Sequence, residues 1–492
     1  MKRISIDPIT RLEGHGRIEI FLDDGGDVAN AYFQVPEFRG FERFCVGRLA
    51  EEMPILTSRI CGICPEAHHL ASVKALDVIF GVKPTETAQK IRELVYTAFF
   101  VNDHATHFFA LGGPDLLVGA DAPPGERNLF GVMAKLGREA AVRFIACRKR
   151  NHHVLQRLGG RGIHLVAGVP GGWSRRLGEE DVAVARDAAA QNIDFARFAL
   201  DLFERAVLRD NRFSEMLHDA CFIHRTYSMG TVDAQNKVGF YDGTLRIVDP
   251  DGAEYARYQP KDYVDHIAEH VEPWTYLKFP YLRTVGWKGL VDGTASGVYC
   301  ATPLARLNVA DGMATSLAQE HYEQLYDYFG SRRQGGRNQP VHHRLATHWA
   351  RLIELLYAAE RMLELASDED IMSSDIRNMP RKKPRSSGVG CVEAPRGTLT
   401  HDYSADENGV ITKVNIISGT TNNHAPIAMS IKRAAQRYIR RGVIVEEGLL
   451  NRIEMAFRLY DPCLACATHA DGSMVSVVVR DGDGGVIRVI QR

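Results

Sequence analysis

Two stretches of the chain, RICGICPEAHH at residues 59–69 and DPCLACATH at residues 461–469, each contain a C-x-x-C pair. The pairs are Cys61/Cys64 and Cys463/Cys466, whereas the other five cysteines stand alone: Cys45, Cys147, Cys221, Cys300 and Cys391. A C-x-x-C pair holds two thiolates close enough to bind one metal ion. Two such pairs make a four-sulfur site suited to a soft or borderline ion such as zinc, iron or nickel.

Other interpretations of the pairs exist. A structural zinc ribbon usually keeps its two pairs within a few tens of residues, whereas nearly the whole chain separates these two. A thioredoxin-like redox pair needs a βαβ context, which the sequence around neither pair offers. Spacing alone leaves two further interpretations open. The pairs could be two unrelated zinc or redox sites, or their thiols could bind no ligand. If the four sulfurs share one metal site, that site ties the two ends of the chain together.

Composition excludes several classes of protein. The 492 residues are 45% hydrophobic and 25% charged, values typical of a globular protein and not of a disordered or fibrous one. The formal net charge of -1 predicts no nucleic-acid partner and no anionic membrane partner. No stretch approaches the ~20 apolar residues of a membrane span, and the start MKRISIDPITRLEGHG resembles no signal peptide. We therefore predict a cytoplasmic protein, with too few cysteines for a disulfide framework.

The apolar pattern predicts a mainly α protein with small β regions (α+β). Residues 16–35 alternate on both sides of a DDGGD turn and predict an N-terminal hairpin. Helical spacing follows from about Pro84, where Ala88, Ile91 and Leu94 begin a substantial helix. Further helices are expected at roughly 129–158, 180–208, 312–329, 342–366 and 446–460. Of these, 342–366 is the clearest amphipathic case.

The remaining segments are expected at the periphery of this long-helix bundle core. Residues 238–305 indicate short strands and loops, residues 389–416 indicate two or three strands, and the last 23 residues indicate a hairpin. The basic stretch 377–388 is more typical of a solvated loop than of a domain boundary. We predict a single interlocked domain over residues 1–492.

The flanks of the two pairs resemble the nickel-binding signatures of the large subunit of nickel-iron hydrogenases. Further matching segments run along the whole chain: DPITRLEGHGRIE at 7–19, EFRGFERF at 37–44, PDLLVG at 114–119, VPGG at 169–172, FPYL at 279–282, TPLARLN at 302–308 and EAPRGTLTHDY at 393–403. The pattern is most similar to cytoplasmic multimeric hydrogenases, above all the NAD-linked type. The resemblance implies that family's large-subunit fold and reversible cleavage of H2.

The resemblance also implies the metal ligands. Cys61 and Cys463 match terminal ligands of nickel, and Cys64 and Cys466 match ligands that bridge nickel to an iron carrying one CO and two cyanides. Soft sulfur donors suit variable-valence metals. Heterolysis of H2 needs a hydride acceptor and a base in contact with the same molecule, and a terminal thiolate can serve as that base.

Further residues match roles around this centre. Glu13 matches the carboxylate that relays a proton away from Cys463, and Arg396 matches the guanidinium held over the metals. Asp115 matches the acid that orients this arginine. His68 matches a donor to a bridging thiolate, while Ala394 and Pro395 match residues that pack around the diatomic ligands. Taken singly, each charged residue is more often a surface group or an ordinary ion-pair member.

Glu42 and His469 match ligands of a buried magnesium ion, a hard cation that prefers oxygen donors. One segment departs from the family pattern, because the register of ISGTTNN places Gly419 where a hydroxyl residue usually contacts a cyanide. Thr420, the next residue, is the expected substitute, or a backbone N–H. The family also loses an extension after the matching histidine to a nickel-dependent endoprotease, so residues 470–492 are expected to be removed after His469. A retained terminal hairpin is the alternative.

Partners are expected to carry the electrons onward. The five remaining cysteines lack the clustered spacing of an iron-sulfur centre, and no convincing dinucleotide or Walker motif occurs. We therefore expect neither an iron-sulfur cluster nor a flavin on this chain. The expected partners are flavin/NAD diaphorase subunits and an iron-sulfur small subunit. A non-catalytic relative from the complex I family is the alternative, although such relatives lack the four cysteines. Electron-bifurcating and heterodisulfide-linked assemblies stay open.

Overall fold

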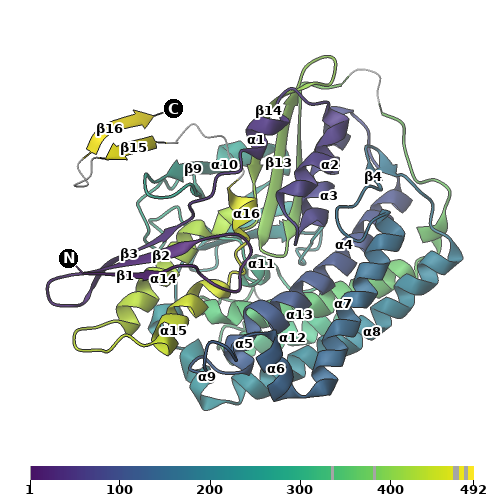
Figure 1. Ribbon diagram of the computed structural model, residues 1–492. Helices are drawn as coiled ribbons and strands as arrows, with labels where there is room; N and C mark the ends of the chain where they lie inside the picture. The colour runs from purple at the N-terminus through teal and green to yellow at the C-terminus, as the bar shows by residue number, and fades with distance from the viewer. Residues whose placement is uncertain (1, 334–336, 381–383, 469–475, 481–485, 492) are drawn as a thin grey trace.

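The computed structural model describes residues 2–333, 337–380, 384–468, 476–480 and 486–491. Long helices form the larger part of the molecule, accompanied by several small sheets, as Figure 1 shows. This is the mainly α architecture with small β regions that the apolar pattern predicts. The expected peripheral position of residues 389–416 is wrong, because the strands Ser387–Ala394 and Gly397–Ala405 are largely buried.

Helix α13 (Thr347–Ala366) is the central element of the helical body. It packs against α4 (Glu86–Thr106) on one side and α8 (Glu179–Phe203) on another. The sequence predicts an amphipathic helix here, but the structure buries its polar residues as well, among them Arg351 and Glu354. A helix buried on all sides needs partners for such groups, and Glu354 has them in Arg306, at 2.6 Å, and His104, at 3.0 Å.

The other expected helices form with one difference. The segment expected as a single helix at 129–158 is divided into α6 (Leu129–Leu136) and α7 (Arg138–Gly159), because Gly137 between them has a φ of +85°. Helices α12 (Ser316–Tyr328) and α15 (Glu447–Arg458) lie within their expected ranges, and α8 continues into a π-helical turn at Glu204–Leu208.

Several helices are absent from the sequence prediction. The long ones are α3 (Pro65–Ile79) and α14 (His424–Tyr438), and a seven-residue helix, α11 (Pro303–Val309), is also among them. The short ones are α1 (Phe41–Cys45), α2 (Met53–Thr57), α5 (Gly113–Leu117), α9 (Asn211–Leu217), α10 (Tyr263–His266) and α16 (Leu464–Ala467). Helix α3 is buried on most sides, so its sequence lacks the polar face by which periodicity identifies a helix. In α14 the first eight residues are all buried and the exposed polar residues are confined to the second half, which leaves a short periodic segment.

The expected N-terminal hairpin is confirmed as β2 (Arg17–Leu22) and β3 (Val28–Gln34), which pair antiparallel with Ile18 opposite Phe33. Strand β1 (Lys2–Ile6) adds a third, antiparallel strand on the other edge of β2. Residues Ile18, Ile20 and Phe33 are buried and join this sheet to the main core.

The remaining sheets are small. One has the order β12 (Ser387–Ala394), β13 (Gly397–Ala405), β14 (Ile411–Ile417), and another has the order β11 (Tyr299–Cys300), β6 (Tyr227–Val232), β7 (Thr244–Val248), β8 (Glu254–Tyr258). Two-stranded pairs are β4 (Gly168–Val169) with β5 (Gly172–Trp173), β9 (Ile267–Val271) with β10 (Lys278–Leu282), and β15 (Ser476–Arg480) with β16 (Val486–Gln491). The last pair is the expected terminal hairpin.

The two ends of the chain meet in the core. Glu13 and Cys463 form a parallel backbone bridge, and the N–H of Leu464 donates to the carbonyl of Glu13 at 2.8 Å. Gly14 is required at this contact, because its φ is +86° and a Cβ atom would lie 2.8 Å from the Cβ of Leu464. One hydrophobic cluster extends from Ile6 to Ala467 and so includes both ends.

Strand β12 packs directly on α3, the helix that follows Cys64. The contact depends on Gly390, where a Cβ atom would overlap the carbonyl oxygen of Ala71 and the backbone nitrogen of Ala75. Backbone atoms inside a helix cannot move aside without strain.

We therefore expect Gly390→Ala to lower the free energy of unfolding by about 2 kcal/mol or more, as overpacking in a rigid core does. Chemical denaturation of the full chain measures this change. Gly125→Ala is the matched control, because a Cβ at Gly125 meets nothing within 4 Å. Equal stability of the two variants would show that α3 and β12 can separate freely.

Candidate metal centre

The four cysteines of the two C-x-x-C pairs lie together in the structure. Their Sγ atoms are all within 4.8 Å of one another and all four residues are buried. The sulfurs of Cys61 and Cys463 are 3.3 Å apart, as are those of Cys64 and Cys466. These separations exceed an S–S bond of about 2.05 Å, and the four cysteines are free. The prediction that the pairs converge is confirmed.

The first pair occupies a turn at the start of α3. The backbone N–H groups of Ile63 and Cys64 donate to the sulfur of Cys61 at 3.2 and 3.1 Å. Cys64 directly precedes Pro65, the first residue of the helix, and proline is favoured there because the first N–H of a helix has no partner to lose. Two backbone donors aimed at one sulfur favour its thiolate form.

The second pair lies at the start of the short helix α16. The backbone reaches it through Asp461, whose φ is +54°. The N–H of Cys463 then donates to Oγ1 of Thr420 at 3.0 Å. Thr420 therefore lies beside this pair, and its hydroxyl proton stays available to a further acceptor.

The chemistry of this donor set fits a metal centre. Burial raises the pKa of the Cys463 and Cys466 thiols well above the usual range. Four negative charges within 4.8 Å of one another would repel strongly in a buried site. A cation removes this conflict, because coordination deprotonates a thiol, and soft sulfur ligands are those that nickel and iron accept.

Glu13 contacts the cluster from the N-terminal segment. The Sγ of Cys463 donates to Oε2 of Glu13 at 3.0 Å, and the N–H of Ala465 donates to the same oxygen at 2.9 Å. Burial raises the pKa of Glu13. The residue also lines a surface cavity of about 590 Å³ together with Arg39, Arg59 and Gly62. One carboxylate thus connects the cluster to the surface.

His68 contacts the cluster from α3. Its Nε2 lies 3.4 Å from the sulfur of Cys466, and its Nδ1 lies 3.1 Å from Nε2 of His401. His401 in turn contacts the hydroxyl of Tyr403, which donates to Ser72 at 3.1 Å. This geometry agrees with the expected position of His68 beside Cys466. The sequence did not predict the contacts that continue from His68 through His401 and Tyr403 to Ser72.

Arg396 carries a buried positive charge near the cysteines. It forms ion pairs with Asp103 at 3.1 Å and with Asp461 at 2.9 Å. The expectation that Asp115 orients Arg396 is wrong. Asp115 pairs instead with Arg11 at 2.5 Å and with Arg458 at 3.0 Å.

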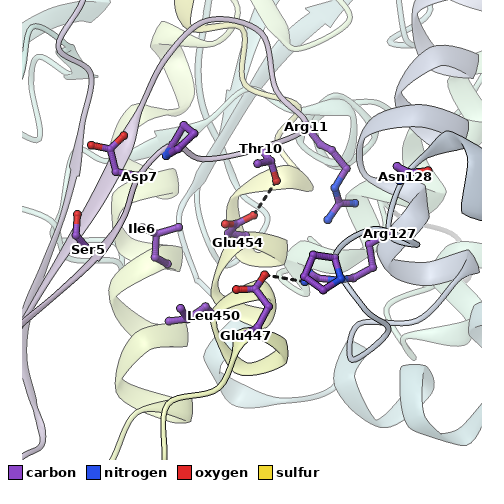
Figure 2. Close-up of a pocket in the computed structure, with 12 residues that line it drawn as sticks. Ser5, Ile6, Asp7, Thr10, Arg11, Arg127, Asn128, Glu447, Leu450 and Glu454 are labelled. Atoms are coloured by element: carbon purple, nitrogen blue, oxygen red, sulfur yellow. Dashed lines mark hydrogen bonds and ion pairs between the residues drawn. The ribbon is translucent and has the colours of Figure 1, made fainter.

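The physical reason is the position of Asp115 on α5. Its carboxylate lies beside α15, where Asn451 donates to it at 3.1 Å. The side chain of Arg11 reaches the same carboxylate from a polar cavity of about 430 Å³. Figure 2 shows this cavity, which Arg11 and Arg127 enter from one side and Glu447 and Glu454 from another. Asp115 therefore joins the N-terminal segment to α15 and takes no part in holding Arg396.

The loop that carries Arg396 is held by two further arginines. Arg306 on α11 donates to the carbonyl of Ala394 at 2.9 Å, and Arg351 on α13 donates to the carbonyl of Pro395 at 3.1 Å. Arg306 is itself fixed by Glu354 and by Glu393, at 3.1 Å. All of these charges are buried. A buried network of ion pairs and hydrogen bonds of this kind rigidifies the segment it surrounds.

Glu42 on α1 is buried and accepts a hydrogen bond from the N–H of Ile416 at 2.8 Å. This contact places its carboxylate against β14. His469, its expected partner in a magnesium site, lies outside the described residues, so the structure does not test that pairing.

Sequence reasoning missed Asp103, Asp461 and His401. A signal existed for Asp461, which lies within the DPCLACATH stretch, and for His401, which lies within EAPRGTLTHDY. Asp103 has no local signal, because it is one polar residue inside the predicted helix α4. Only the packing of α4 brings it to Arg396.

Comparison with known proteins assigns the family. Residues 39–122 and 295–469 match the family model described as nickel-dependent hydrogenase, and residues 3–38 match a model described as HoxL-like. The chain belongs to the nickel-dependent hydrogenase family. With the four buried cysteines in place, it is a catalytic large subunit of a nickel-iron hydrogenase.

Individual relatives extend over the whole chain. The chain is 45% identical over 493 residues to an iron-sulfur subunit of the F420-non-reducing hydrogenase of Archaeoglobus profundus, covering 100% of both proteins. It is 38% identical over 504 residues to the beta subunit of the NAD-reducing hydrogenase HoxS of Cupriavidus necator, covering 99% of both. The structure of an NAD+-reducing [NiFe]-hydrogenase matches with a TM-score of 0.87 and 38% identity over 95% of this chain and 100% of that chain.

No helix in the described part of the chain combines the length and apolar character needed to cross a membrane.

The two aspartates, Asp103 and Asp115, allow a direct test of the corrected assignment. We expect Asp103→Asn to lower hydrogen-dependent dye reduction about 10- to 100-fold, because a small displacement of Arg396 costs that much in a preorganised site. Asp115→Asn should keep the activity within about twofold and instead lower the free energy of unfolding by about 1 to 3 kcal/mol. Loss of activity in a stable Asp115→Asn variant would contradict the assignment.

Proposed function

We propose that Cys61, Cys64, Cys463 and Cys466 hold a nickel and an iron, with Cys61 and Cys463 as terminal ligands of nickel and Cys64 and Cys466 as bridges to iron. The observation that carries this proposal is the convergence of four buried sulfurs within 4.8 Å. The iron would carry one CO and two cyanides, as the family assignment implies. When bound, this centre supplies the redox chemistry that interconverts H2 with two protons and two electrons.

Proton transfer is the task of Glu13. Its Oε2 accepts a hydrogen bond from the sulfur of Cys463 at 3.0 Å, so a proton on that sulfur needs no rearrangement to reach the carboxylate. A raised pKa makes Glu13 a stronger base than a surface carboxylate. From there the proton can leave through the 590 Å³ cavity that Glu13 lines.

Arg396 places a permanent positive charge over the cluster. Its donors can contact a cyanide nitrogen or a small ligand, because the guanidinium is a planar fork that stays charged. Asp103 and Asp461 fix its orientation. Ala394 and Pro395 would line the space for the diatomic ligands, Thr420 would contact one cyanide, and His68 would donate to the sulfur of Cys466.

A magnesium ion bound by Glu42 and His469 is part of the proposal. The support is the buried carboxylate of Glu42, which lies next to the backbone of β14. A hard cation there would neutralise that carboxylate.

We propose that an iron-sulfur small subunit docks over the cavity at Glu13. This is the surface through which the buried cysteines approach solvent, since Arg59, Gly62 and Ala465 line the cavity beside both C-x-x-C segments. Exposed apolar side chains occur in the same part of the chain, with Phe38 45% and Phe44 49% exposed. Exposed apolar groups beside a redox centre are typical of a subunit interface.

The proposed electron acceptor is NAD(P)+, reached through flavin-containing diaphorase subunits in the cytoplasm. The 38% identity with the NAD-reducing HoxS beta subunit over the full chain supports it. A second candidate is another soluble acceptor, which is favoured by the identity of up to 45% with relatives named F420-non-reducing hydrogenases. Hydrogen-dependent reduction of NAD+, NADP+ and a viologen dye by the purified complex distinguishes the two.

Removal of residues 470–492 by a maturation endoprotease, with cleavage between His469 and Ala470, completes the proposal. The support is the family assignment, whose model match ends at residue 469. Alternatively, the terminal hairpin β15–β16 is retained.

Metal analysis combined with infrared spectroscopy tests the proposed centre. We expect about one nickel per chain and stretching bands of metal-bound CO and cyanide in the purified complex, because four soft thiolates select these metals. The intact mass of the same sample reports whether the chain ends at His469. Cys463→Ser should remove nickel and the bands, whereas Cys300→Ser, a buried cysteine outside the cluster, should keep both. Zinc alone would exclude the hydrogenase centre and favour a structural zinc site, whereas the absence of any metal would favour the non-catalytic complex I-like alternative.

Glu13→Gln tests the proton path separately. The amide keeps the size of the side chain but cannot relay a proton, so we expect H2/D+ exchange to fall about 100-fold or more while nickel content and infrared bands stay unchanged. Glu37→Gln, which lines the same cavity, is the control and should retain exchange. Loss of nickel from Glu13→Gln would instead assign Glu13 to the stability of the cluster.

A further inference from the structure

Helices α7 and α8 lie side by side on the outside of the helical body, as Figure 1 shows. They run antiparallel. Arg157 near the end of α7 pairs with Asp181 near the start of α8 at 2.7 Å, and the guanidinium of Arg143 near the start of α7 lies 4.8 Å from the ring centre of Phe198 near the end of α8.

An apolar groove separates the exposed sides of these two helices. The groove encloses about 590 Å³, and Ala146 of α7 together with Ala183 and Val184 of α8 lines it. Val142 and Ile145 are 55% and 54% exposed on the neighbouring turns of α7. Small residues at the floor allow another helix to approach closely, and large exposed ones beside it gain free energy from burial.

The two sides of the groove carry opposite charge. Helix α7 contains six arginines and lysines against one glutamate, whereas α8 contains six acidic residues against two arginines. Lys149 and His153 lie along the α7 side of the groove, and Glu180 and Asp187 lie along the α8 side. Glu180 also pairs with Arg157 of the same chain at 2.7 Å, an exposed ion pair that contributes little. A partner whose surface carries a single charge sign would be attracted by one of the two helices and repelled by the other.

We propose that this face binds a second copy of the same chain, with α7 of each copy packed on α8 of the other. A two-fold axis that runs along the groove produces this arrangement. It places the basic side of one copy opposite the acidic side of the other at the same level along the helices. The four helices then form a bundle in which every neighbour is antiparallel, a stable arrangement in proteins.

The face is large enough for such a contact. Helices of 22 and 25 residues are roughly 33 and 37 Å long, so a two-helix face about 20 Å wide offers on the order of 700 Å² per copy, close to the ~800 Å² of a standard interface. The net charge of -1 per chain causes no general repulsion between copies. The proposal goes beyond the proposed function, because none of these residues belongs to the metal centre or the Glu13 cavity.

Charge reversal provides the test. The acidic-α7 variant carries Lys149→Glu with His153→Glu, and the basic-α8 variant carries Glu180→Lys with Asp187→Lys. Light scattering coupled to size-exclusion chromatography of the full-length chain should show twice the 54.8 kDa of one copy for the wild type. Each variant alone should dissociate, with a dissociation constant about 100-fold higher or more. An equal mixture of the two variants should restore the dimer, because both halves of the mixed interface are then complementary.

Rescue by mixing separates this interface from a folding defect, since a misfolded chain gains nothing from a second variant. Ile145→Arg, at the apolar part of the face, should also dissociate the dimer, and Val291→Arg, at an exposed valine outside α7 and α8, should not. A wild-type mass of one copy would overturn the proposal, as would a dimer that survives both charge variants or a mixture that stays dissociated. Capture of a different protein by this face in a monomeric wild type would overturn it equally.

Discussion

The contact between the two ends of the chain is the constraint on which the metal centre depends. The backbone bridge between Glu13 and Cys463 brings the second C-x-x-C pair against the N-terminal segment, and the same contact places the Glu13 carboxylate on the cysteine sulfur. Because a side chain at Gly14 would collide with Leu464, Glu13 and the second cysteine pair share one piece of local geometry. The last sulfur ligands therefore reach their positions only when the beginning of the chain is in place.

The buried charged side chains around this contact form separate ion-pair networks. Arg396 with Asp103 and Asp461 lies near the cysteines, and Arg306 with Glu354 and Glu393 lies behind the loop that carries Arg396. Buried ion pairs contribute little net stability because desolvation offsets their attraction, but they restrict the orientation of the charged groups that they join. These ion pairs hold the Arg396 guanidinium at a fixed place near the four cysteine sulfurs. Asp115 belongs to a third network, with Arg11 and Arg458, which joins the N-terminal segment to α15.

The surface carries two separate proposed interfaces, one at the Glu13 cavity and one on α7 and α8. The cavity at Glu13 lies next to both cysteine segments, and it is where we propose that the electron-accepting partner docks. The α7–α8 face lies on the helical body and carries its own charge pattern. The two proposed interfaces share no residues, so an electron-transfer partner and a second copy would not compete for the same surface.

The sequence by itself determined the family, the four cysteines and most of the long helices. Spaced motifs such as RICGICPEAHH and DPCLACATH carry chemistry in the residues themselves. Amphipathic periodicity indicates helices such as α7 and α8, which expose one face. Helix α3 was missed because burial on most sides removes that periodicity, and α14 was missed because its exposed polar residues are confined to its second half. Only the tertiary structure decided that Asp103, and not Asp115, holds Arg396. Such a pairing depends on how α4 and α5 are oriented against distant segments, and no local pattern of residues records that orientation.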